Sequence, residues 1–455
     1  MFRDLLTSAR RQRLVDPRAW IGRVVIWLAA IAVGLVVVAF AELSDRAFAL
    51  FTGLQARWYW APLVLTPTVG MAVLWLTRRY FRGAEGGGIP QVIAASGERI
   101  DPAHTSRFVS LRIAAGKFTL VLGALAGGFS VGREGPSVQL GASLMYACRS
   151  LLPRGFPMDP RNLIVAGGAA GMAAAFNTPL AGIVFAIEQL ARRFEQRTNG
   201  VLIAAIVWAG LVSLAILGDY TYFGRMAVSA VDLSIVPVVV VAGIVCGLAG
   251  GLFGRLLLVG VSRLPTFARV QSAHPVLFAG GCGLLVAVIG LLSAGASFGG
   301  GYETTRALLE GSVDAPWTYS LARFAATVLS ALSGIPGGIF APSLAVGAGI
   351  GADLAPFAPA GVSATAVAAL CMAAYLSAVT HAPLTSFIVV MEMVDGHAMV
   401  LSLMAVAMIA SLVSRVITRP LYETLADRML AALPPSAAAA PASAATPDPQ
   451  KQATP

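Results

Sequence analysis

Three short segments rich in glycine and proline carry the residue types that could bind an anion. They read GGGIP at residues 86–90, GREGP at 132–136 and GIFAP at 338–342. Glycine lets backbone N–H groups approach a ligand closely, and proline fits the first turn of a helix without loss of a hydrogen bond. The free N–H donors and partial positive charge of such helix starts attract anions. Several of them together would hold an anion weakly enough to release it, as transport requires.

One carboxylate, Glu134, lies inside the second of these segments, at the predicted start of a helix. In a soluble protein, an acid at this position would be an ordinary helix-start residue. Within a membrane segment, an ionisable side chain indicates function, because its charge is unfavourable at that depth. Glu134 could occupy the anion site itself and move aside when it is protonated or when an anion displaces it. We therefore interpret Glu134 as a candidate gate.

Four other side chains could take part in the movement of ions or protons. Glu188 and Glu392 each stand nine residues beyond the proline of a Pro-Leu pair. Glu188 fits an interfacial ion pair as well as a proton relay, whereas Glu392 is interpreted as structural. Lys117 lies in an apolar run and needs an acidic or carbonyl partner, unless it supplies positive potential to an anion site. Tyr422 is placed like an aromatic anchor at a membrane boundary.

The elements that position these residues are membrane-spanning helices. The chain has 455 residues, of which 57% are hydrophobic and 12% are charged. A soluble domain carries about 25% charged residues, so neither a soluble globule nor a disordered chain fits. This composition predicts an all-α polytopic membrane protein.

The net charge of +10 comes almost entirely from arginine. The arginines cluster at the ends of apolar segments, which is a positive-inside pattern and not a nucleic-acid-binding surface. The clusters are Arg10, Arg11 and Arg13; Arg78, Arg79 and Arg82; and Arg192, Arg193 and Arg197.

The cysteines and histidines show no spacing that is typical of disulfides or metal ligands. Cys148, Cys246, Cys282 and Cys371 lie far apart in apolar surroundings, and the histidines form no HExxH pattern. We predict buried free cysteines, no metal site and no cofactor.

The interrupted segments recur in two halves of the chain. Pro136 and Pro342 each precede a glycine by five residues, and they lie 206 positions apart. Pro179 and Pro383 each begin a Pro-Leu pair that is followed by a glutamate, and they lie 204 positions apart. Matching interruptions in two halves indicate a substrate site between repeats, near the middle of the membrane.

These offsets divide the chain into four parts. We predict a first membrane repeat over residues 21–230 and a second over residues 231–432. Residues 1–20 are expected to form a cytoplasmic N-terminal segment. The tail over residues 433–455 is rich in alanine and proline and is expected to be disordered.

These motifs resemble those of the CLC family of voltage-gated chloride channels and chloride/proton antiporters. GREGP and GIFAP match family elements fully, GGGIP resembles the element GSGIP, and Tyr422 falls where the family has an anion-coordinating tyrosine. The similarity keeps order and spacing over residues 20–430. It implies a prokaryotic-type member without CBS domains. Such a protein is a homodimer whose subunits each have one anion pathway and two inverted halves with many short, tilted and broken helices.

The resemblance also assigns roles to individual residues. Glu134 would be the external gate, and the Tyr422 hydroxyl would contact the central anion. The other anion-binding positions would be Gly87, Gly88, Ile89, Arg133, Gly135, Ile339 and Phe340. The implied partners are chloride or a similar small anion, a second copy of the chain and the lipid bilayer of the inner cell membrane.

Three departures from the family pattern bear on function. Gly87 replaces the usual serine of GSGIP, which removes one hydroxyl from the central site. Gln91 replaces a frequent glutamate and leaves Lys117 without an obvious acidic partner. Gln189 stands where many antiporters have an internal proton-transfer glutamate, and an amide carries no proton at physiological pH. We therefore predict chloride transport that is gated by Glu134 and is channel-like or uncoupled; coupled chloride/proton antiport is the alternative.

Two other classes of protein fit less well. A membrane enzyme needs a nucleophile with a base or a pair of aspartates, and the chain offers no GxSxG pattern and only a lone Asp353. A cation transporter with Glu134, Glu188 and Glu392 as ligands would meet repulsion from the positive helix starts. We predict a transporter without enzymatic activity.

Overall fold

The structure is a computed structural model that describes residues 17–190, 199–218, 223, 233–260, 265–312 and 316–433. These residues contain eighteen α-helices and no named strand, and eight of the helical segments are long and apolar enough to cross a membrane. The predicted all-α polytopic class is therefore confirmed. Most of the predicted N-terminal segment and tail, together with the arginine cluster at 192–197, lies outside the described residues.

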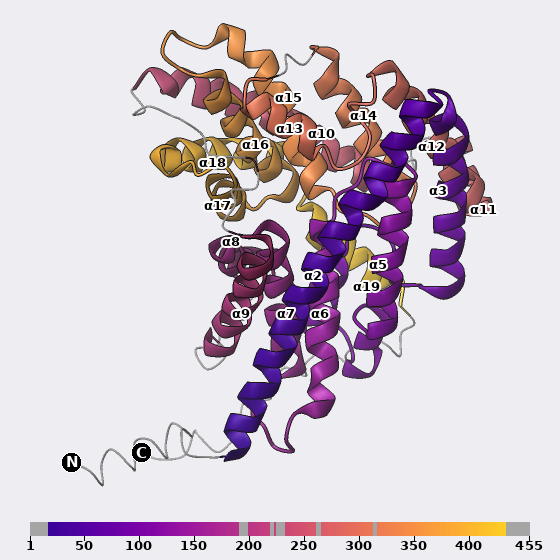
Figure 1. Ribbon diagram of the computed structural model, residues 1–455, viewed down its shortest axis with the longest axis vertical. Coiled ribbons are helices and arrows are strands. Elements are labelled where there is room, and N and C mark those ends of the chain that lie inside the picture. Colours follow the sequence, from indigo (N-terminus) through magenta and orange to yellow (C-terminus); the bar gives the residue numbers. More distant parts are fainter. Residues whose placement is uncertain are drawn as a thin grey trace, which may run out of the picture.

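The helices form two consecutive groups along the chain (Figure 1). The first group is α2 (Pro17–Arg57), α3 (Ala61–Tyr80), α4 (Ile89–Ser96), α5 (Leu111–Ala126), α6 (Glu134–Ala147), α7 (Pro160–Phe176), α8 (Pro179–Phe185) and α9 (Asn199–Leu217). The second group is α10 (Val236–Val259), α11 (Pro265–Ala273), α12 (Pro275–Leu292), α13 (Tyr302–Leu309), α14 (Thr318–Leu332), α15 (Phe340–Leu354), α16 (Ala364–Thr380), α17 (Pro383–Met393), α18 (Val400–Ile417) and α19 (Leu421–Ala431).

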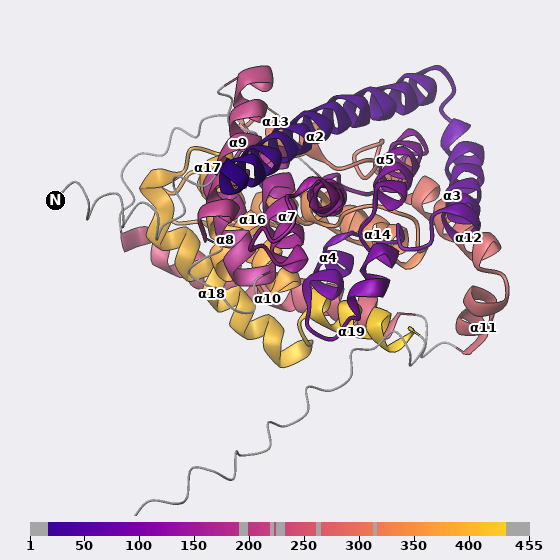
Figure 2. The same ribbon diagram turned by 90° about the horizontal axis from the view of Figure 1, so that it is seen from below.

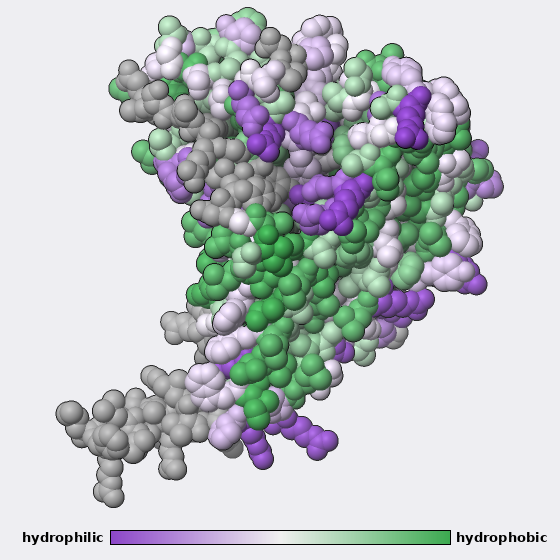
Figure 3. Space-filling model, viewed as in Figure 1, coloured by the Kyte–Doolittle hydropathy of each residue, from purple (hydrophilic) through white to green (hydrophobic). Residues whose placement is uncertain are grey.

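Helix α2 defines the thickness of the apolar region. It contains no charged residue between Arg23 and Glu42, a separation of 19 positions. At 1.5 Å per residue this stretch is about 28 Å long, close to the ~30 Å of bilayer hydrocarbon. Figure 3 shows the corresponding hydrophobic surface along the lower part of α2, with hydrophilic side chains below and above it.

The two halves repeat the same local design in opposite orientation. Helices α7 and α16 each end at a residue with left-handed backbone, Asn177 (φ 56°) and His381 (φ 55°). Each is followed two positions later by the proline that begins the next helix, α8 or α17. Helices α8 and α17 pack together, and the glutamate that follows each Pro-Leu pair bonds to the first turn of the other helix. This antiparallel contact agrees with the inverted repeat of the predicted fold class.

The core of the second half is built around α16, which is buried along nearly its whole length. It packs against α10, α15 and α18, while α7 has the same central position beside α6 and α9 in the first half. All four cysteines are buried and free, as predicted. Helix α19, at the end of the described chain, lies beside the short helix α4 (Figure 2), which brings Tyr422 back toward the first half.

Candidate anion site

Three glycine-containing loops meet where α4, α6 and α15 begin. Gly132 and Gly338 exchange two backbone hydrogen bonds of 2.7 and 2.8 Å. The N–H of Gly337 donates to the carbonyl of Gly86 at 3.0 Å. The three helix starts that the sequence predicted to bind an anion are therefore adjacent, although the bonded residues Gly86 and Gly337 are 251 positions apart in the chain.

The close contact of these loops requires glycine at two positions but not at a third. Gly88 has φ 98°, and a Cβ atom there would lie 2.6 Å from the carbonyl oxygen of Gly135. A Cβ atom on Gly135 would lie 2.5 Å from the carbonyl oxygen of Gly87. By contrast, a Cβ atom on Gly87 would meet nothing closer than the Gly337 oxygen at 3.8 Å. Gly87, which replaces the family's serine, thus leaves room for a side chain.

Glu134 is the first residue of α6, and its side chain is fully buried. Its Oε2 atom accepts a hydrogen bond from the backbone N–H of Ala341, the second residue of α15, at 3.4 Å. Its Oε1 atom has no hydrogen-bond partner in the described part of the chain. The carboxylate thus lies at the N-terminus of a helix from the other half, where a free anion would bind.

Donors remain available beside this carboxylate. The backbone N–H groups of Ile339 and Phe340 make no hydrogen bond to the described residues. The Tyr422 ring stacks on the Phe340 ring, with centroids 6.4 Å apart and an interplanar angle of 1°. Tyr422 is 3% exposed, and no hydrogen bond joins its hydroxyl to a described protein group. Two N–H groups and one hydroxyl are therefore available for a ligand.

Lys117 on α5 supports the first loop through its carbonyl groups. Its buried Nζ atom donates to the carbonyl oxygens of Gly86 at 2.8 Å and Glu85 at 3.4 Å. Of the two partners that the sequence allowed, the structure shows a carbonyl. Gln91 completes the loop, because its Nε2 donates to the Glu85 carbonyl and its Oε1 accepts from the Gly88 N–H at 3.1 Å. The Gly88 N–H is consequently already engaged by the protein.

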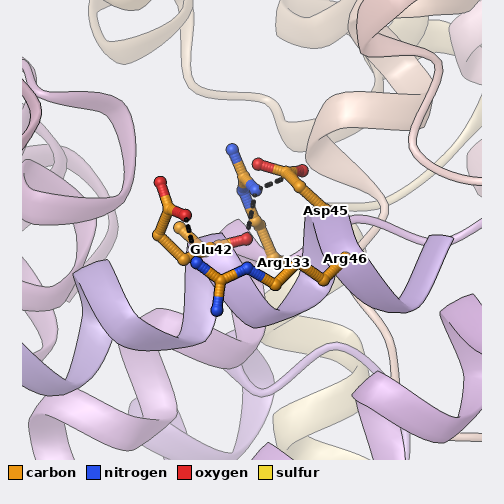
Figure 4. Close-up of polar contacts among 5 residues, drawn as sticks. Glu42, Asp45, Arg46 and Arg133 are labelled. Carbon is orange, nitrogen blue, oxygen red and sulfur yellow. Dashed lines mark hydrogen bonds and ion pairs between the residues drawn. The ribbon is translucent and has the colours of Figure 1, made fainter. Parts of the chain in front are cut away.

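The side chain of Arg133 extends away from the helix start toward α2 (Figure 4). Its Nη1 atom donates to the Ala41 carbonyl at 2.8 Å and to the Asp45 carboxylate at 2.7 Å. Glu42 and Arg46 form a neighbouring exposed ion pair at 3.4 Å. Because these residues follow the uncharged stretch of α2, the loop that carries Glu134 is anchored near one edge of the apolar region.

Arg323 on α14 is a buried cation that the sequence analysis missed. It is 1% exposed and lies against the carbonyl groups of the loop before α13 and against Ser130, two residues before GREGP. Its acceptors are the carbonyls of Ala296, Ser297, Phe298 and Gly299 and the Ser130 hydroxyl oxygen. The available signal was a single arginine within an apolar helix, the pattern by which Lys117 was noticed.

Buried charge in this region is mainly positive. Among the described residues, the lysine, arginine and glutamate side chains that are buried are Lys117, Arg133, Arg323 and Glu134. Three basic side chains against one acidic side chain favour an anion over a cation beside the loops. This arrangement argues against a cation transporter, because a cation would meet the positive helix starts and the basic side chains.

Comparison with known proteins places the chain in a family. The profile of the family described as voltage gated chloride channel matches residues 69–415, more than half of the chain. The chain belongs to the CLC family. Similar proteins include the H(+)/Cl(−) exchange transporters ClcA of Klebsiella pneumoniae subsp. pneumoniae and of Salmonella typhimurium. The first is 32% identical, and the alignment covers 90% of this chain and 89% of the relative. The second is 31% identical, and the alignment covers 90% of this chain and 85% of the relative.

Solved structures of other CLC proteins share the fold. A slow cyanobacterial Cl−/H+ antiporter superposes with a TM-score of 0.79 at 24% identity, covering 92% of this chain and 99% of that one. A CLC-type fluoride/proton antiporter gives a TM-score of 0.72 at 23% identity, covering 89% of this chain and 97% of that one. At these identities the likeness establishes the fold alone. Membership of the family makes the chain a multi-pass chloride transporter of the inner membrane, and CLC transporters are not enzymes.

Glu188 and Gln189, which the sequence analysis considered for proton transfer, lie at the contact between the two halves. Glu188 accepts hydrogen bonds from the backbone N–H groups of Leu384 (3.0 Å) and Thr385 (2.7 Å) and from the Thr385 hydroxyl (2.7 Å). Reciprocally, Glu392 accepts from the N–H of Ala181 at 3.1 Å. Each carboxylate therefore caps the first turn of a helix in the opposite half, and Glu392 has the structural contact that was expected of it.

Gln189 is joined to the backbone of the second half. Its Nε2 atom donates to the Thr380 carbonyl at 3.3 Å. Both oxygens of the neighbouring Glu188 are already hydrogen-bonded. Neither side chain hydrogen-bonds to the three loops around Glu134. Within residues 179–190, Glu188 is the only carboxylate, and it is engaged in helix capping.

Proposed function

We propose that this CLC protein is a coupled chloride/proton antiporter in which Glu134 both closes the anion pathway and carries the proton. The observation that carries the proposal is the bond from the Ala341 N–H to the Glu134 carboxylate, which occupies a helix start as an anion would. Protonation removes the charge and weakens this charge-assisted bond. Chloride can then take the free N–H groups nearby. One side chain thereby links the movement of both ions.

The relatives favour coupling over the channel-like mode that the sequence predicted. Proteins named H(+)/Cl(−) exchange transporters match over 90% of the chain. Uncoupled conduction remains the second candidate because Gln189, an amide, stands at the internal proton-transfer position. Coupling therefore requires that a chain of water molecules delivers protons to Glu134 past Gln189 and the engaged carboxylate of Glu188.

The central anion is proposed to lie between the starts of α4 and α15. Ile339 and Phe340 supply backbone N–H groups, and Tyr422 supplies its hydroxyl. Gly88, with its N–H bonded to Gln91, contributes close backbone packing. The remaining predicted positions act through their backbone and are Gly87, Ile89, Arg133 and Gly135.

The gate is proposed to lie toward the outer face of the membrane. Arg23 marks the arginine-rich, cytoplasmic end of α2 by the positive-inside rule. Arg133 contacts Asp45 beyond the opposite end of the uncharged stretch. We retain residues 21–230 and 231–432 as the two repeats, since the equivalent helices α6–α8 and α15–α17 fall on either side of that boundary.

A homodimer is proposed to form through the outer faces of α8, α9, α17 and α18. These faces carry large exposed apolar side chains: Leu180, Ile203, Val207, Leu211, Leu384, Leu401, Met408 and Leu412. Light scattering of the purified protein measures the number of chains per particle. A particle with a single chain would contradict the dimer.

Proton movement in chloride-loaded liposomes tests the transport mode, with a chloride gradient and no proton gradient. Antiport predicts uphill proton movement in the wild type and none in Glu134→Ala, which retains chloride flux. Chloride efflux without proton movement in the wild type would refute antiport and support uncoupled conduction. The variant Gln189→Glu then tests whether an internal carboxylate restores coupling.

A further inference from the structure

A cavity of about 370 Å³ lies between the first turns of α2 and α9. Helix α2 contributes four of its lining residues, Trp20, Arg23, Ile26 and Trp27, and α9 contributes Gly200, Val201 and Ala204. Trp20 is 43% exposed and Gly200 is exposed, so the cavity opens to the outside of the molecule. None of these residues belongs to the three anion-binding loops.

The cavity lies at the level of the lipid headgroups. Arg23 is the last charged residue before the uncharged stretch of α2, whose length of about 28 Å matches the hydrocarbon thickness. A tryptophan stands on either side of Arg23 in the helix, and tryptophan favours the boundary between hydrocarbon and headgroups. The arginines of this end indicate the cytoplasmic leaflet.

The charge of Arg23 is available to a ligand. Its guanidinium lies 5.1 Å from the centre of the Trp20 ring, a contact that orients the group without using its N–H donors. No carboxylate pairs with it in the part of the chain that the structure describes. A guanidinium matches a phosphate through two parallel hydrogen bonds, and basic pockets between membrane helices bind anionic headgroups.

The other walls are apolar and firmly packed. Trp27 contacts Trp20 edge to face at 6.1 Å and lies 6.0 Å from Trp208 of α9. Ile26 and Val201 add aliphatic surface beside them. A Cβ atom on Gly200 would meet no atom within 4 Å, so the glycine leaves space. One charged end and apolar walls match a phospholipid better than a free inorganic anion.

We propose that this cavity binds an anionic phospholipid of the cytoplasmic leaflet. The Arg23 guanidinium binds the phosphate, Trp20 lies at the headgroup, and the upper part of an acyl chain packs against Trp27 and Val201. The site is separate from the chloride pathway. The proposal therefore does not depend on whether transport is coupled.

Native mass spectrometry of the purified protein, titrated with phosphatidylglycerol or phosphatidylcholine, tests the site. We expect tighter binding of phosphatidylglycerol and a roughly five- to tenfold loss of its affinity in Arg23→Ala. Arg57→Ala, at the opposite end of the same helix, is the matched control and should bind as the wild type does. Gly200→Trp fills the cavity while it keeps the arginine and should also weaken binding. Gly53→Trp, at another open helical glycine, is its control.

Several results would overturn the proposal. These are equal affinity for the two lipids, wild-type affinity in Arg23→Ala, or wild-type affinity in Gly200→Trp. Displacement of the lipid by millimolar inorganic phosphate alone would show a simple anion site instead. Chloride efflux from liposomes checks that each variant is folded, because Arg23 and Gly200 contact none of the anion-binding loops.

Discussion

A serine introduced at either of two adjacent glycines should have opposite effects on the anion site. Gly87→Ser restores the hydroxyl that the CLC motif usually has, and the nearest atom to its Cβ would be 3.8 Å away. Gly87 is not among the glycines with positive φ, so a serine there is unstrained. We expect its free energy of unfolding to stay within about 0.5 kcal/mol of the wild type. A hydroxyl that donates to an anion contributes about 1.5 kcal/mol or more, which is roughly tenfold in affinity.

Gly88→Ser should instead destabilise the protein. At φ 98° an L-residue costs about 1–2 kcal/mol. Its Cβ would lie 2.6 Å from the Gly135 oxygen and 3.0 Å from the Gln139 Cβ, and such overpacking costs about 1–3 kcal/mol more. The expected loss is therefore roughly 2–5 kcal/mol. The serine side chain would displace the backbone of residue 88, which packs against α6.

Thermal unfolding and calorimetric titration with chloride measure the two effects. We expect a stable Gly87→Ser protein with about tenfold tighter chloride binding and an unstable Gly88→Ser protein. Equal destabilisation by both changes would refute the steric argument. A stable Gly87→Ser protein with unchanged chloride affinity would refute the placement of residue 87 beside the anion.

Three further predictions concern charge. Acid protonates Glu134 and removes its hold on the start of α15, so chloride efflux should rise as pH falls in the wild type and be independent of pH in Glu134→Gln; a flat wild-type profile would contradict the gate. Glu188→Ala leaves two N–H groups uncapped and should lower the free energy of unfolding by about 2–4 kcal/mol, whereas Glu392→Ala uncaps one N–H group and should lower it by about 1 kcal/mol. Denaturant unfolding in detergent measures both values, and the reverse order would contradict the capping geometry. Lys117→Met removes the donor to the Gly86 carbonyl and should weaken chloride binding, with Gly87→Ser as a stable comparison in the same titration; unchanged affinity would show that Lys117 does not position the loop.

Local sequence was sufficient for the features that depend on neighbouring residues. Glycine and proline at 86–90 and 132–136 predicted helix starts, and α4 and α6 begin within these segments. Two prolines 204 residues apart predicted equivalent helices, and α8 and α17 begin at them. The low share of charged residues predicted membrane helices, because composition alone decides whether a chain can cover itself with polar surface.

Local sequence did not predict the hydrogen-bond partners of individual side chains. The sequence left Glu188 open between an ion pair and a relay, and the structure shows it bonded to N–H groups 196 and 197 positions away. Arg323 was overlooked because its carbonyl partners belong to a loop whose position follows only from packing. Likewise, nothing local distinguishes Gly87, which has space, from Gly88, which touches Gly135.

The sequence by itself therefore determined the membrane class, the repeated halves, the helix starts and the residue types that can bind an anion. Each of these follows from composition or from contacts within a few residues. Only the tertiary structure decided that Glu134 lies against a helix of the other half, that Lys117 bonds to carbonyls and that Glu188 and Glu392 cap opposite helices. The physical reason is that these hydrogen bonds join segments distant in the chain, and packing of the two halves brings them within reach.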